Sequence, residues 1–177
     1  MAPPADLLRS AFRELHGSRL HGFALLLTLG DGARAARLSA DALRAAEADL
    51  GSHRHPERAA AWLRAHVLGA AGRRSGRRLP PERQAALEEL GVNGPARAGL
   101  TALSTRERAA VIAASIERLE ALDVATIVGR DGGRLESLLR RARTRYLEAA
   151  AVVPPDSDFP AGPIRERVLA GATRAFT

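Results

Sequence analysis

Apolar residues recur along most of the chain with the spacing of an α-helix. They fall at every third or fourth position over residues 5–15 and again over 20–27, and a Gly-Ser pair at 17–18 separates the two runs. The same spacing predicts three further helices, over residues 33–49, 56–68 and 82–90. No stretch alternates clearly at period two, and windows rich in Ala and poor in β-branched residues favour helix. The sequence therefore predicts an all-α fold.

The second half of the chain predicts another set of helices. Ser104, followed by Glu107 three residues later, has the spacing of a capping box and predicts a helix that runs through Ile116. A short helix, a glycine turn and a long helix are then expected over residues 120–128, 129–133 and 134–151. Two prolines at 154–155 are expected to end the long helix, and the pattern predicts one weak helical stretch over residues 164–170.

Two breaks separate these sets of helices. Residues 72–81 read GRRSGRRLPP, which is linker composition, and residues 91–95 read GVNGP. We therefore expect two small helical domains joined by a basic linker that contains the short helix, with a tail at the C-terminal end. Their expected bounds are 1–72 for the first domain, 73–98 for the linker, 99–152 for the second domain and 153–177 for the tail.

Composition narrows the possible chemistry only a little. The 177 residues include no Cys, which excludes disulfides, thiol nucleophiles and thiolate metal sites. All 27 basic residues are Arg and the net charge is +7, a mild excess that no single segment concentrates. The N-terminus lacks the layout of a signal peptide, and the longest apolar run, Phe23 to Leu29, is too short to span a bilayer. We expect a cytoplasmic protein without membrane insertion.

Catalytic and metal-binding patterns are not found in the sequence. No pair of carboxylates lies in an evident apolar pocket, and no nucleophile motif surrounds any Ser. The glycine-containing turn at 129–133 lacks the Lys-Ser/Thr pair of a phosphate-binding loop and follows a helix rather than a strand. His53 and His55 have no neighbouring carboxylates suited to zinc. We therefore expect neither an enzyme nor a bound cofactor or metal.

The strongest pattern is the helix, glycine turn and longer helix over residues 120–145. This is the layout of a helix-turn-helix, whose second helix can enter the major groove of DNA. Leu122 and Ile127 on the first helix, with Leu135 and Leu138 on the second, would hold the two together. The predicted DNA contacts are Arg130, Arg134, Glu136, Ser137, Arg140, Arg141, Arg143 and Arg145. An ordinary solvated helix is the alternative, since acidic residues interrupt the positive stripe.

The order of several segments resembles a known family. Residues 103–111 read LSTRERAAV, 116–119 read IERL, 125–129 read ATIVG and 135–143 read LESLLRRAR. Together they resemble the fourth conserved region of bacterial sigma factors, especially the extracytoplasmic-function group. The N-terminal block, with FALLLT at 23–28, Gly-Asp at 30–31 and AWL at 61–63, is similar to the second region of that family. The resemblance covers about 145 residues.

This resemblance implies a transcription initiation protein that recruits the RNA polymerase core to promoter DNA. The first domain would bind the polymerase through Arg37, Leu38, Asp41 and Arg44. It would open the promoter with Arg54, His55, Arg58 and Trp62. The second domain would read the upstream promoter element, and an anti-sigma factor or another regulatory protein is a further expected partner.

Several positions depart from the family pattern. Arg37 reverses a charge at the expected polymerase contact, and the chain has few aromatic residues to stack on melted bases. Two alternatives therefore stay open. One is a divergent sigma-like regulator that no longer opens promoters, and the other is a helical partner-binding protein whose Arg content reflects composition alone.

Overall fold

The computed structural model describes residues 5–48, 55–72 and 79–152, and every regular element in these ranges is helical. The elements are α1 (Ala5–Leu27), α2 (Gly32–Glu47), α3 (Pro56–Ala71), α4 (Pro81–Glu89), α5 (Gly94–Ala102), α6 (Thr105–Val111), the π-helical turn η2 (Ile112–Ile116), α7 (Ala121–Val128) and α8 (Gly132–Ala151). The prediction of an all-α fold is confirmed. None of these described helices has both the length and the apolar composition needed to cross a membrane.

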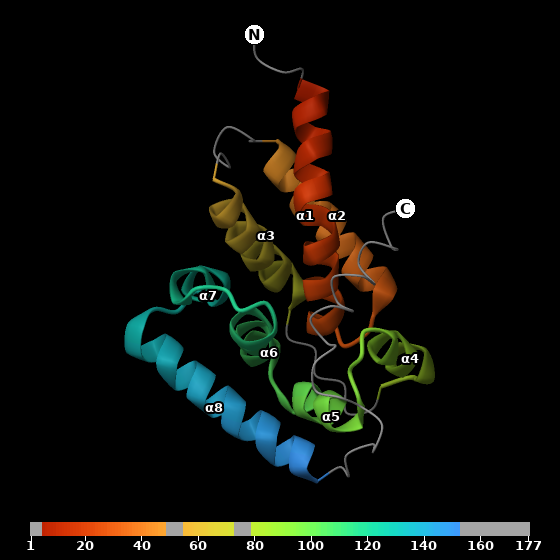
Figure 1. Cartoon of the computed structure of the whole chain (residues 1–177), viewed down its shortest axis with the longest axis vertical. Helices are drawn as coiled ribbons and strands as arrows, with labels where there is room; N and C mark the ends of the chain where they lie inside the picture. The colour runs from red at the N-terminus through yellow and green to blue at the C-terminus, as the bar shows by residue number, and fades with distance from the viewer. Residues whose placement is uncertain (1–4, 49–54, 73–78, 153–177) are drawn as a thin grey trace.

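The helices form one connected body with α8 along its outer edge (Figure 1). α1, α2 and α3 pack on one another, α5 and α6 pack on α8, and α3 packs on α7. One continuous core of buried apolar side chains extends from Leu20 on α1 to Leu138 on α8. The two predicted sets of helices therefore share a core in this structure, and the domain boundaries stay a prediction.

The expected break in the first helix is wrong. α1 is continuous through residues 17 and 18, and Gly17 is buried within it. A glycine inside a helix costs only about 1 kcal/mol relative to Ala, which packing on one side can offset. The buried side chains of Leu20 and Phe23, both at 0% exposure, provide that packing.

The predicted linker is partly built into the core. Leu79, which precedes α4, and Leu87, within α4, are both buried. α4 lies against the turn between α1 and α2, where Gly30 has a φ of +78° and its α-carbon faces the backbone carbonyl of Arg83. Arg83 also donates to Asp31 at 2.5 Å. This segment is therefore fixed to the turn between α1 and α2 by both a close backbone contact and an ion pair.

Helix α5 was not predicted. Asn93 caps it by accepting from the backbone N–H of Ala96 at 2.9 Å, and Pro95 stands in its first turn. The glycine and proline of GVNGP, which indicated only a break, are therefore the start of a helix. The next predicted start is confirmed: Ser104 and Glu107 form both hydrogen bonds of a capping box at the start of α6.

Two buried arginines tie the second set of helices to the first. The guanidinium of Arg108, 1% exposed, donates to the backbone carbonyls of Leu27 at 2.7 Å, Leu100 at 2.9 Å and Leu103 at 2.8 Å. Burial lowers the pKa of Arg108 to about 10, so it stays charged at neutral pH. On α3, Arg64 donates from Nε to Glu117 at 2.7 Å, at the end of η2.

Candidate nucleic-acid interface

Helices α7 and α8 are joined by a short exposed turn. α7 ends at Gly129, whose φ of +62° is a left-handed conformation that favours glycine. The backbone N–H of Arg130 then donates to the carbonyl of Ala125 at 3.2 Å, which closes the turn. Asp131 precedes α8, and every residue from Gly129 to Arg134 is exposed. The bounds of both helices agree with the sequence prediction to within two residues.

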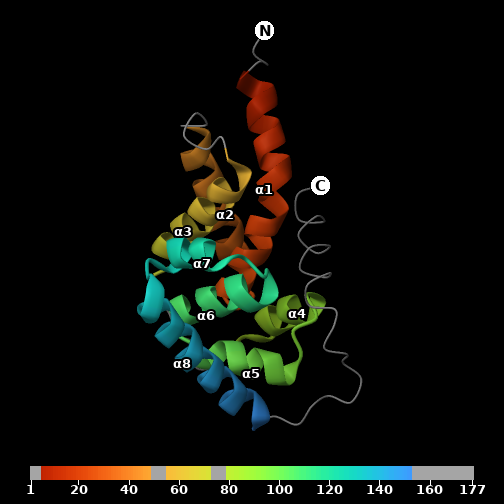
Figure 2. The same cartoon turned by 60° about the vertical axis from the view of Figure 1, so that its left-hand side comes forward.

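The inner side of α8 fixes it to the rest of the molecule. Leu135, Leu138 and Ala142 are buried, and so is Ile127 on α7. Leu122 was expected to help hold the two helices together, but it is 76% exposed and faces solvent. The outer side of α8 is open in both views (Figures 1 and 2).

The predicted DNA contacts divide between two sides of α8. With about 3.6 residues per turn, Arg134, Arg141 and Arg145 lie along one side, and we call these three residues the α8 arginine row. Arg143 is nine positions after Arg134 and therefore points to the opposite side, where it lines a cavity. The remaining predicted contacts on this helix are exposed: Ser137 and Arg140 lie between these two sides, and Glu136, seven positions before Arg143, lies on the side of Arg143.

A buried carboxylate holds the second half of the arginine row. Glu107 on α6 has a side chain that is only 2% exposed. Its carboxylate accepts from Arg141 Nε at 2.9 Å and from Arg145 Nη1 at 3.1 and 3.2 Å. The same carboxylate accepts from the backbone N–H of Ser104 at 3.0 Å and from its hydroxyl at 2.8 Å.

These contacts keep Glu107 ionised. Desolvation alone raises the pKa of Glu107, but the hydrogen bonds from Ser104 and Arg141 and the charge of Arg145 outweigh it, so its pKa lies below the ordinary 4.5. Arg141 and Arg145 keep exposed side chains, at 62% and 52%, in spite of the pairing. The buried carboxylate therefore orients two guanidinium groups whose other N–H donors still face solvent.

The first half of α8 carries cations without a carboxylate partner in the described part of the chain. Arg134 and Arg140 are exposed and take part in no ion pair there, and Arg130 bonds only the carbonyl of Gly129, at 3.1 Å. Arg130 and Arg134 lie at the N-terminal end of α8, where the helix dipole and free backbone N–H groups favour an anion, whereas Arg140 lies about two turns further along the helix. Neither Glu136 nor Glu148 forms an ion pair with an arginine of α8 in the described part of the chain.

The predicted polymerase contacts on α2 do not all share one surface. Arg37, Asp41 and Arg44 are exposed, and Asp41 accepts a hydrogen bond from Arg44. Leu38 is buried in the core at 8% exposure, so its side chain does not lie on that surface.

Of the predicted promoter-opening residues, Arg54 lies outside the described residues. His55 and Arg58, at the start of α3, are exposed. Trp62 is partly buried, packs against the core and lies 5.2 Å from the ring of His66, centroid to centroid.

Sequence reasoning missed Glu107 as the residue that organises α8. The signal was present, because the capping-box spacing singles out Glu107, but a capping role alone does not require burial against arginines more than thirty residues away.

Three comparisons with known proteins, against family models, curated proteins and solved structures, found no match to this chain.

Proposed function

We propose that this protein is a sigma-factor-like, DNA-binding transcription initiation protein that recruits RNA polymerase to promoters. In this proposal α7 and α8 are a helix-turn-helix and α8 is the helix that enters the major groove. The observation that carries the proposal is the arginine arrangement on α8: Arg134 unpaired among the described residues, and Arg141 and Arg145 oriented by the buried Glu107.

This arrangement suits DNA for two physical reasons. Arg has a planar fork of donors that binds phosphate oxygens or the two acceptors on a guanine edge. Side chains that are already held in place lose less conformational entropy when they bind, which favours Arg141 and Arg145 as contacts. Arg130 and Arg134, beside the exposed N-terminal end of α8, are placed to meet the phosphate backbone or the first base edges. Glu136 can accept from cytosine, at a cost in repulsion from phosphate.

Recruitment of polymerase is assigned to the exposed surface of α2. Arg37, Asp41 and Arg44 are all available there for a protein contact, and the sequence resemblance gives the surface this role. Because Leu38 is buried, it supports α2 from within rather than making the contact itself.

A second candidate is a sigma-like regulator that does not open promoters. The shared core favours it, because α3 packs on α7 and the Arg64–Glu117 pair, 5% and 13% exposed, joins the two sets of helices. The first candidate assigns the two sets of helices to two separate promoter elements, whereas in this structure they share one core. Trp62, partly buried in the packed form, is not displayed for stacking on a melted base.

Binding and initiation assays with the full chain distinguish the two candidates. DNA duplexes selected from a random pool by the chain plus RNA polymerase core provide a test promoter. We expect the chain to coelute with core and to support transcription from the selected duplexes. Coelution and DNA binding without initiation favour the second candidate, and failure to bind both core and DNA contradicts the proposal.

A matched pair of variants links the polymerase contact to α2. Arg37→Glu changes an exposed side chain and is expected to alter coelution with core, because reversing a charge at an interface changes its electrostatic complementarity. Arg9→Glu, on the exposed part of α1, makes the same charge change outside the proposed surface and is expected to leave coelution unchanged. Equal effects from both variants would remove the assignment to α2.

A further inference from the structure

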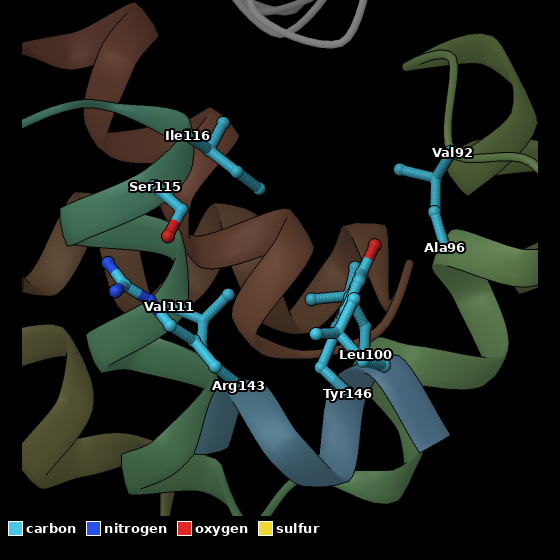
Figure 3. A pocket seen from close by; sticks show the side chains of 9 residues that line it. Val92, Ala96, Leu100, Val111, Ser115, Ile116, Arg143 and Tyr146 are labelled. Atoms are coloured by element: carbon cyan, nitrogen blue, oxygen red, sulfur yellow. The ribbon is translucent and has the colours of Figure 1, made fainter. Parts of the chain in front are cut away.

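An apolar cavity of about 290 Å³ opens between α5, η2 and the second half of α8. In Figure 3, Ile116 and Val92 face each other across the opening, with Leu100 and Tyr146 below them. The polar groups at its edge are Ser115, the hydroxyl of Tyr146 and the guanidinium of Arg143.

The described residues leave this apolar surface open to solvent. Leu147, which lines the cavity, is 65% exposed. Arg143, at the rim, has no carboxylate partner among the described residues. An open apolar cavity beside a cation is typical of an interaction site.

The chain itself supplies a segment that begins beside the cavity. α8 carries Tyr146 and Leu147 into the cavity wall and ends at Ala151, about 6 Å of helix further along. Residues 153–177 follow directly. The first eleven of them, VPPDSDFPAGP, are rich in proline and can span up to about 35 Å when extended, which is enough for the chain to turn back.

The sequence of residues 153–177 matches the cavity in two ways, by the apolar pattern of residues 164–170 and by the acidic residues that precede them. Residues 164–170 read IRERVLA after a proline, and helical spacing places Ile164 and Val168 on one side. The cavity is about twice the size of one that holds a benzene molecule, so it has room for two aliphatic side chains but not for a helix. Asp156 and Asp158, which precede Ile164 by eight and six positions, can supply a carboxylate partner for Arg143.

We propose that residues 164–170 dock on this cavity, with the side chains of Ile164 and Val168 inserted between α5, η2 and α8. The docked segment would cover Leu147 and draw Arg143 toward the acidic residues of the tail. Because Arg143 is on the side of α8 opposite Arg134, docking leaves the arginine row open. The proposal does not depend on DNA binding or on the role of the protein in transcription.

A spin label in the full chain tests this placement. The chain has no cysteine, so Ser115→Cys at the cavity rim gives one labelling site, and Leu7→Cys on the exposed start of α1 gives a control site. We expect the label at position 115 to broaden the amide resonances of residues 164–170 strongly, and the label at position 7 to leave them sharp. No broadening from position 115, or equal broadening from both positions, overturns the proposal.

Two neighbouring substitutions test the side chains themselves. Val168→Asn removes an inserted apolar group and is expected to lower the docking equilibrium constant about tenfold, as loss of one buried aliphatic side chain does. Arg167→Asn introduces the same residue one position earlier, away from the inserted side, and is expected to leave the broadening unchanged. Equal effects of the two overturn the insertion of Val168.

Other occupants of the cavity would give different results. Spin-labelled protein without isotope is mixed with isotope-labelled protein without spin label, and broadening in this mixture means that a second copy supplies the segment. Native mass spectrometry that finds a copurified small amphipathic molecule, together with no broadening, means that this molecule fills the cavity. Either result overturns docking within one chain.

Discussion

Replacing Glu107 by Gln tests whether its buried charge fixes α8 to α6. The substitution keeps the size of the side chain but removes the charge that accepts from Arg141, Arg145 and Ser104. The amide keeps one acceptor oxygen, and its NH₂ group faces guanidinium donors that it cannot accept from. The protein is therefore expected to lose several charge-assisted hydrogen bonds at once.

The expected cost is moderate because the partners differ in burial. The two hydrogen bonds from Ser104 lie at a carboxylate that is 2% exposed, and bonds to a buried charge contribute about 1.5–3 kcal/mol each. The two arginines are more than half exposed and can return to water, so their pairing contributes less. With one acceptor retained, we expect Glu107→Gln to lower the free energy of unfolding by about 2–3 kcal/mol. The melting temperature would then fall by roughly 4–12 °C.

The pH dependence identifies the charge as the source of this effect. The pKa of Glu107 in the folded protein lies below its ordinary 4.5, so its stabilisation is complete above that value and is lost as the pH falls through the folded-state pKa. In urea titrations the difference between wild type and Glu107→Gln should therefore shrink below pH 4.5. Glu136→Gln, on the exposed side of α8, is the control and should change stability by less than about 0.5 kcal/mol. A difference between wild type and Glu107→Gln that stays constant into strong acid would refute the reasoning.

Three further predictions concern the Arg64–Glu117 ion pair, the close contact at Gly30 and the burial of His21. Arg64→Met leaves Glu117 largely buried without its partner and should lower the free energy of unfolding in urea by about 3 kcal/mol. Adding Glu117→Leu should recover part of this loss, and no recovery would argue against the ion pair. Gly30→Ala should lower the free energy of unfolding by more than about 1 kcal/mol, because its Cβ would lie 2.3 Å from the backbone oxygen of Arg83. Gly69→Ala, in open space within α3, is the control and should raise it slightly. Similar effects of the two substitutions would argue against the close contact at Gly30. Burial lowers the pKa of His21 below 6.5, so stability should rise with pH up to about 6.5, and this rise should be smaller in His21→Gln.

Local signals in the sequence predicted most of the helices. The capping box at Ser104 and the proline at the start of α3 gave correct starts, because each acts within one helical turn. Gly17 gave a wrong break, since its cost is offset by the packing of Leu20 and Phe23, whose burial depends on helices that are distant in sequence. α5 was missed because Gly94 and Pro95 suggest a loop unless the cap at Asn93 is recognised.

The candidate site was only partly predictable, because its contacts join distant residues. Glu107 and Arg141 are 34 positions apart, and no periodicity within α8 reveals that pairing. Helical spacing does place Arg134 and Arg143 on opposite sides, so this division could have been predicted from the sequence. The partial burial of Trp62 could not, since it depends on how α3 packs in the core.

DNA binding by α8 is tested most directly by the salt dependence of affinity. Fluorescence anisotropy with a labelled duplex, over a series of salt concentrations, compares wild type with Arg134→Gln and with the double variant Arg134→Gln/Arg140→Gln; Arg37→Gln on α2 is the control. We expect a slope of log K against log salt of about −3 to −4 for wild type, smaller by about 1 for each arginine removed and unchanged for Arg37→Gln. A wild-type affinity that does not depend on salt, or α8 variants that bind like the control, would contradict DNA binding by this helix.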